Sequence, residues 1–240
     1  MHLDLNGRTI NYKVSGNGDS FLLVHGWGGN SKSLEDLATL LSAKYQVITV
    51  DLPGFGHSSG PDPDWGVGEY AQFLIDFICE LKLRPVIYFG HSFGGALGIF
   101  LAKKYPEYIG KLILSGASYK RYAPTTSKIS ILFKWLPSIV KKVLYKVIFP
   151  QSDLFKVPSL EKNFRKIVRQ DLSPLLPSIK IPTLILWGEN DKETPILQAY
   201  ELEKRIKNSR LKIFPDIGHN LPLLKPLIVF EEINKFMHKI

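Results

Sequence analysis

Cysteine is scarce in this 240-residue chain, and long apolar runs and a secretory signal are missing from it. Each of these observations excludes a class of protein. Cys79 is the only cysteine, so no disulfide forms within the chain, and a reducing cytosol is compatible with the sequence. No apolar run approaches the roughly 20 residues that a membrane-spanning helix needs. The first residues lack the basic and apolar regions of a secretory signal. We therefore expect a cytoplasmic protein without a transmembrane segment.

Acidic residues are scarce in one segment. Residues 119–180 contain 13 Lys and Arg but only 3 Asp and Glu, a net charge of +10. The rest of the chain contains 18 Lys and Arg and 19 Asp and Glu, a net charge of −1. The net charge of +9 therefore arises from this segment. No recognised nucleic-acid-binding motif accompanies the charge, so a nucleic acid partner is not expected.

Outside the basic segment, short apolar stretches alternate with helical patterns. This alternation predicts a mostly parallel sheet that is covered by helices on both faces. Ligands of such sheets bind beyond the carboxyl ends of the strands, where the following loops converge. The predicted strands are 2–6 and 9–14, which form a hairpin at Asn6-Gly7, then 21–24, 46–50, 86–89, 111–114, 183–187 and 210–214; the predicted helices are 33–43, 70–81, 93–104, 195–206 and 227–238.

The strand pattern stops within the basic segment. Residues 127–135, 138–148 and 159–169 have apolar and basic faces at helical spacing, and prolines separate them. This segment is therefore predicted to be helical and inserted into the α/β chain.

The stretch 86–95 combines a predicted strand, the motif Gly90-x-Ser92-x-Gly94 and the start of a helix. A nucleophile elbow has this arrangement, since small neighbours allow a sharp turn that presents the serine above the sheet. The alternative interpretation is an ordinary glycine-rich turn.

A serine nucleophile needs a base, which is usually a histidine oriented by a carboxylate. Asp191 and His219 each lie in a loop after a predicted strand, and both follow Ser92 in the chain. We predict that Asp191 is the acid and His219 the base. Glu189 and Glu193 compete for the acid role, His25, His57 and His91 compete for the base role, and Asp216 is interpreted as a turn former.

Acyl transfer also needs hydrogen-bond donors for the oxyanion. The backbone N–H of Phe93, which follows the nucleophile, and that of Trp27, in the glycine-rich loop 25–29, are the predicted donors. The alternative, a phosphate-binding loop, lacks the lysine and spacing of a P-loop, and loop 25–29 is not the dinucleotide motif Gly-x-Gly-x-x-Gly.

Five motifs after predicted strands span most of the chain. They are His25-Gly26-Trp27-Gly28-Gly29, Asp51-Leu52-Pro53-Gly54-Phe55-Gly56-His57-Ser58, Gly90-His91-Ser92-Phe93-Gly94-Gly95, Pro182-Thr183-Leu184-Ile185-Leu186-Trp187-Gly188-x-x-Asp191 and Gly218-His219. Together they resemble the α/β-hydrolase fold family with a helical cap. Haloalkane dehalogenases and epoxide hydrolases of this fold use an aspartate nucleophile, and Ser92 excludes them.

The resemblance implies an α/β-hydrolase core over 1–118 and 179–240, and a cap over 119–178 that is inserted after the sixth strand. Its apolar side is expected to line an acyl site. Its lysines, Lys134, Lys141, Lys142, Lys146, Lys162 and Lys166, either form a solvated face or attract an acidic carrier protein or an anionic surface. Neither a metal nor an organic cofactor is implied.

The function predicted from these residues is a serine hydrolase that cleaves carboxylic esters with short-to-medium acyl groups through an acyl-enzyme on Ser92. Two enzymatic alternatives stay open: a carbon–carbon bond hydrolase acting on a dienoate-type ketone, and a hydrolase of carrier-protein esters or thioesters. Outside the enzymes, the alternative is a catalytically silent binding protein of the same fold.

Overall fold

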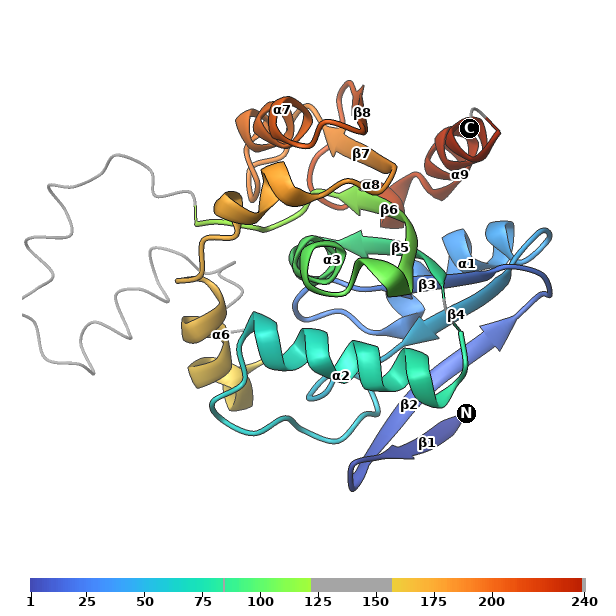
Figure 1. The fold of residues 1–240 in the computed structure, drawn as a ribbon, viewed down its shortest axis with the longest axis vertical. Helices are drawn as coiled ribbons and strands as arrows, with labels where there is room; N and C mark the ends of the chain where they lie inside the picture. The colour runs from blue at the N-terminus through green and yellow to red at the C-terminus, as the bar shows by residue number, and fades with distance from the viewer. Residues whose placement is uncertain (84, 122–156, 239–240) are drawn as a thin grey trace, which may run out of the picture.

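The computed structural model describes residues 1–83, 85–121 and 157–238. Within them, strands form one eight-stranded sheet in the order β1-β2-β4-β3-β5-β6-β7-β8 (Figure 1). β2 pairs antiparallel with β1 and β4, and all other neighbours are parallel. The predicted mostly parallel sheet is therefore confirmed. The strands are β1 His2–Leu5, β2 Arg8–Ser15, β3 Ser20–Val24, β4 Gln46–Val50, β5 Val86–His91, β6 Ile109–Ser115, β7 Thr183–Gly188 and β8 Ser209–Phe214.

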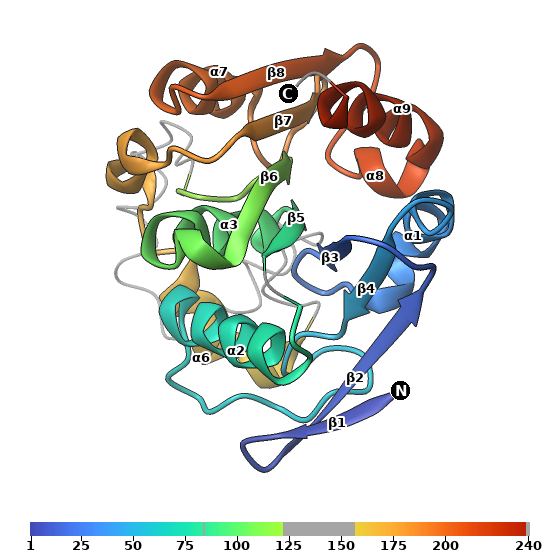
Figure 2. The ribbon, with the colours of Figure 1, turned by 45° about the vertical axis from the view of Figure 1, so that its right-hand side comes forward.

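Helices cover both faces of the sheet (Figure 2). One face packs against α2, α3 and α7, and the opposite face packs against α1, α8 and α9. The helices are α1 Glu35–Leu41, α2 Val67–Glu80, α3 Phe93–Lys104, α6 Glu161–Ile167, α7 Ile196–Arg205, α8 Leu221–Leu224 and α9 Pro226–Met237.

The central strands are mostly apolar because both of their faces are buried. All six residues of β5 are buried. In β3, Leu22 and Val24 pack into one core cluster, while Phe21 and Leu23 pack into the other. Successive side chains of a strand point to opposite faces, so a strand between two helical layers needs apolar residues at every position.

The helix predicted over 70–81 begins earlier in the structure, at Val67. Its start is fixed by a capping interaction, in which the Gly66 N–H donates to Glu69 Oε2 at 2.6 Å. The single turn α8 was not predicted, because four residues are too few to show helical periodicity.

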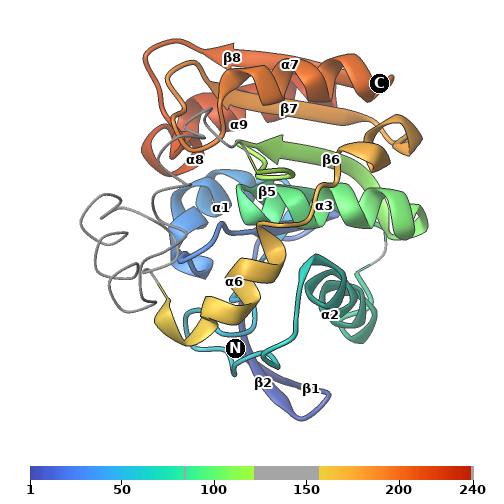
Figure 3. The same cartoon turned by 90° about the vertical axis from the view of Figure 1, so that its left-hand side faces the viewer.

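Residues 122–156 lie outside the described residues, and so do the helices predicted over 127–135 and 138–148. The third predicted helix, over 159–169, contains α6, which lies beside the start of α2 (Figure 3). There the Val67 N–H donates to Gln170 Oε1 at 2.9 Å, and Lys166 forms an ion pair with Glu69. The cap boundaries 119–178 stay a prediction.

Candidate active site

Ser92 occupies a strained turn between β5 and α3. Its φ is 52° and its ψ is −111°, a conformation that L-residues rarely adopt and that costs on the order of 1–3 kcal/mol. The turn closes only around glycine: a Cβ at Gly90 would lie 2.3 Å from the Gly94 carbonyl oxygen, and one at Gly94 would lie 2.3 Å from that of Val24. The sharp turn predicted from the motif is therefore present.

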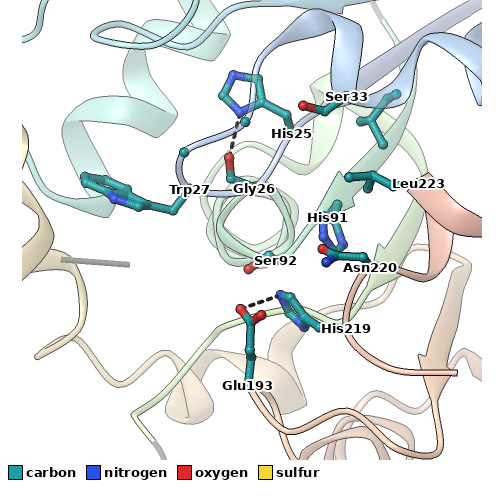
Figure 4. A pocket seen from close by; sticks show the side chains of 13 residues that line it. His25, Gly26, Trp27, Ser33, His91, Ser92, Glu193, His219, Asn220 and Leu223 are labelled. Atoms are coloured by element: carbon teal, nitrogen blue, oxygen red, sulfur yellow. Dashed lines mark hydrogen bonds and ion pairs between the residues drawn. The ribbon is translucent and has the colours of Figure 1, made fainter. Parts of the chain in front are cut away.

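The loops that follow β3, β5, β7 and β8 meet at one edge of the sheet, because these strands run parallel. They surround a cavity of about 190 Å³, which we call the Ser92 pocket. Figure 4 shows Ser92 and His219 on its wall, with the glycine-rich loop on the opposite side. The lining residues used below are His25, Gly26, His91, Ser92, Glu193 and His219.

His219 and Asp191 are in direct contact. His219 Nδ1 lies 2.8 Å from Asp191 Oδ2, and both side chains are almost fully buried. Of the competing carboxylates, Glu193 approaches the other ring nitrogen, with Oε2 3.6 Å from Nε2. The geometry therefore places Asp191, rather than Glu193, on the Nδ1 side of the ring.

Asp191 is held as an ionised acceptor. Its burial acts to raise the pKa, but the hydrogen bond and charge of His219 and the hydrogen bonds from Thr194 outweigh burial and lower it. Thr194 donates through its N–H to Oδ1 at 2.8 Å and through Oγ1 to Oδ2 at 2.7 Å. A carboxylate only accepts, so the Nδ1 proton of His219 points to Asp191 and Nε2 is left as the basic nitrogen.

The competing histidines have structural contacts instead. His25 Nδ1 donates to the Gly26 carbonyl at 2.7 Å, while its Nε2 accepts from the Leu52 N–H at 3.1 Å. His91 Nδ1 lies 3.1 Å from the Ser115 carbonyl. Burial lowers the pKa of His25 to about 4, and burial together with the nearby His219 lowers that of His91 to about 3. Both rings are therefore neutral at pH 7.

His57 and Asp216 fill backbone roles. The His57 N–H donates to Asp51 Oδ2 at 2.9 Å, within a loop that Asp51 organises. Asp216 has a φ of 58°, as expected for the turn former that the sequence indicated.

The backbone amides of Trp27 and Phe93 both border the site. The Trp27 ring points away from Ser92 (Figure 4), and its centroid lies 5.2 Å from that of Phe164 in α6. Within residues 1–83, 85–121 and 157–238, neither amide donates a hydrogen bond. Both N–H groups are thus without an acceptor in this part of the chain.

A second cavity of about 160 Å³ shares Trp27, Ser92 and Glu193 with the Ser92 pocket. We call it the Phe164 pocket, after the α6 residue on its wall. Its apolar floor includes Phe93 and Ile167, whereas Lys120 and Arg121 bring positive charge to its rim. Ser92 lies where the two pockets join.

Sequence reasoning missed Thr194 and Gly116. Thr194 fixes Asp191, and Gly116, with a φ of +53°, lies so close that a Cβ there would be 3.1 Å from His219 Nδ1. The side chain of a loop aspartate often accepts from backbone N–H groups two or three residues later, which was a usable signal for the Thr194 N–H. No local pattern relates Gly116 to His219.

Among the described residues, no group of three or more His, Cys, Asp or Glu side chains is placed to hold a metal ion. None of the helices in this part of the chain has the length and apolar character needed to cross a membrane.

Comparisons with known proteins agree with this architecture. Residues 21–232 match the model of a family described as "Alpha/beta hydrolase family". The chain is 29% identical to serine hydrolase BPHL of Homo sapiens, over 91% of this chain and 79% of the relative. It is 30% identical to the 2-hydroxy-6-oxononadienedioate/2-hydroxy-6-oxononatrienedioate hydrolase of Escherichia coli, over 91% of this chain and 88% of the relative. An esterase of Exiguobacterium antarcticum has a similar structure, with a TM-score of 0.78, 24% identity and 98% coverage of both chains.

Proposed function

The chain belongs to the alpha/beta hydrolase family, and from this premise we propose that it is a serine hydrolase that cleaves carboxylic esters through an acyl-enzyme on Ser92. The observation that carries the proposal is the buried pair of His219 and Asp191, with Nδ1 2.8 Å from Oδ2, whose His219 lines the same pocket as Ser92. The pair leaves Nε2 as the basic nitrogen in that pocket.

In the proposed reaction, Ser92 Oγ attacks the ester carbonyl carbon while His219 Nε2 takes the hydroxyl proton. The tetrahedral intermediate then expels the alcohol, which receives that proton from His219, and the acyl group stays on Ser92. Water attacks this acyl-enzyme with His219 again as base, which releases the carboxylic acid and restores Ser92. Asp191 keeps the ring in the correct tautomer and stabilises the imidazolium form.

The oxyanion of each intermediate is proposed to accept hydrogen bonds from the N–H groups of Trp27 and Phe93. Both amides lack a partner among the described residues, which supports this role. Each such donor contributes on the order of 3 kcal/mol to transition-state stabilisation. The glycines around Trp27 let the backbone approach Ser92: a Cβ at Gly26 would lie 3.0 Å from the Ser92 Cβ.

The test is the intact mass of the protein after treatment with a small fluorophosphonate, for the parent and for Ser92→Ala. We expect a single adduct on the parent and none on the variant, together with loss of ester turnover. A folded parent that remains unlabelled would contradict an activated Ser92 and favour the silent binding protein.

A second candidate function is carbon–carbon bond hydrolysis of a dienoate-type ketone. It is favoured by the relative from Escherichia coli, which is named as a hydrolase of such compounds. Lys120 and Arg121 on the rim of the Phe164 pocket also suit a substrate that carries carboxylates. Steady-state kinetics on an ester series and a dienoate ketone would separate the two, since kcat/KM should be larger by orders of magnitude for the correct class.

Docking of an acidic carrier protein or an anionic surface on the basic segment stays a prediction. Four of the six lysines named for it lie outside the described residues. Of the two that are described, Lys166 donates hydrogen bonds to Glu69 and to the Asp64 carbonyl, so its charge is partly neutralised within the chain.

A further inference from the structure

One charged side chain lies on the described lining of the Ser92 pocket. Among the described residues that line it, Glu193 is the only Asp, Glu, Lys or Arg. His25 and His91, also on the wall, are neutral at pH 7 because burial lowers the pKa of each, to about 4 and about 3. Among the described lining residues, no lysine or arginine therefore offsets the negative charge.

Glu193 is held in place at the mouth of the pocket. Its backbone N–H donates to Asp191 Oδ1 at 2.9 Å, which ties it to the loop that carries the acid. Its side chain is 48% exposed, and Oε2 lies 3.6 Å from His219 Nε2. Figure 4 shows the carboxylate directed at the His219 ring, beside Ser92.

Positive charge lies on the lining of the second pocket, the Phe164 pocket. Lys120 and Arg121 border the Phe164 pocket and are absent from the lining of the Ser92 pocket. Lys120 forms an ion pair with Glu201, which leaves Arg121 as the main source of positive charge on that rim. A substrate group in the Ser92 pocket therefore meets Glu193 with no lysine or arginine on the described lining, whereas in the Phe164 pocket Glu193 is accompanied by Lys120 and Arg121.

We propose that Glu193 is a specificity-determining residue, which makes the Ser92 pocket select esters whose end in this pocket is neutral or cationic and reject esters that are anionic there. The proposal rests on the proposed function, since it assumes that substrate binds across Ser92. We take the substrate charge to lie about 6 Å from the half-exposed Glu193 carboxylate. At that distance the carboxylate raises kcat/KM of a cationic ester, and lowers kcat/KM of an anionic ester, by about three- to tenfold.

The experiment compares three esters of matched size, one neutral, one with a quaternary ammonium group and one with a carboxylate. Two such sets are made, with the charge on the acyl end or on the alcohol end, because either end can occupy the Ser92 pocket. Each kcat/KM is divided by that of the neutral ester, so that any general effect of a variant cancels. The proteins are the parent, Glu193→Gln, Glu193→Lys and the matched control Glu189→Gln, which removes the same charge from an exposed position of the same loop.

In one of the two sets, we expect Glu193→Gln to lower the relative kcat/KM of the cationic ester and to raise that of the anionic ester, each by about three- to tenfold. Glu193→Lys should make the anionic ester the preferred substrate of that set. Glu189→Gln should keep the parental ratio. Unchanged ratios in both sets, or an equal shift in Glu189→Gln, would overturn the role of Glu193 while leaving Ser92 catalysis intact. A parent that hydrolyses none of the esters and forms no fluorophosphonate adduct would overturn the proposed function itself.

Discussion

The substitution Gly116→Ala tests whether the contact between β6 and the His219–Asp191 pair is functional. Gly116 directly follows β6 and has a φ of +53°. A Cβ at this position would lie 3.1 Å from His219 Nδ1, 3.2 Å from its Cε1 and 3.3 Å from Asp191 Oδ2. The methyl group therefore presses on both partners of the pair at the atoms that join them.

Two effects of Gly116→Ala can be separated. The first is backbone strain. An L-residue in the left-handed region lowers the free energy of unfolding by about 1–2 kcal/mol, which lowers Tm by about 2–8 °C in a chain of this size. The second is displacement of His219 and Asp191 by a few tenths of an ångström. Since a shift of 1 Å in a reacting group can cost about 10²-fold in rate, we expect kcat/KM to fall about tenfold.

Gly7→Ala is the matched control. Gly7 has a φ of +75°, and nothing lies within 4 Å of a Cβ built on it. It shares the backbone strain but is remote from the pocket residues, so its Tm should fall by a similar amount with kcat/KM unchanged. Tm by thermal unfolding and kcat/KM on a neutral ester are measured for both variants. Parental kcat/KM in Gly116→Ala, or an equal loss of kcat/KM in Gly7→Ala, would contradict a functional contact between Gly116 and the His219–Asp191 pair.

Three further predictions follow from the buried polar groups. Asp191→Asn replaces the ionised acceptor of His219 Nδ1 and should lower kcat by about 10²–10⁴-fold with the fold retained; a loss below tenfold in steady-state assays would contradict its role. His25 and His91 have folded pKa values of about 4 and about 3, below the ordinary 6.5. The unfolded chain therefore gains protons first, and stability falls as pH drops from 6.5, by up to about 2.7 kcal/mol per pH unit; equal urea midpoints at pH 7 and 5.5 would argue against buried neutral rings. Asp51→Ala leaves three donors without an acceptor, namely the Ser31 N–H at 2.6 Å, Asn11 Nδ2 at 2.8 Å and the His57 N–H at 2.9 Å. It should lower the free energy of unfolding by about 3–5 kcal/mol, and a change under 1 kcal/mol in urea titrations would show that the hydrogen bonds are replaced by water.

The sequence alone predicted the fold class and the turn at Ser92, because both depend on local patterns. The apolar run 86–89 at the start of β5 follows from burial on two faces, and the turn follows from the spacing of Gly90 and Gly94. The convergence of the loops on one edge also followed, since the carboxyl ends of parallel strands share an edge. The helices predicted within 122–156 stay predictions, because they lie outside the described residues.

Only the tertiary structure decided which groups meet at that edge. The sequence offered Glu189, Asp191 and Glu193 on one loop, and the conformation of the loop directs Asp191 to Nδ1 of His219 and Glu193 to Nε2. The closeness of Gly116 to His219 depends on the arrangement of β6, β7 and β8 side by side in the sheet. Such contacts join residues that are far apart in the chain, so neither periodicity nor motif spacing can encode them.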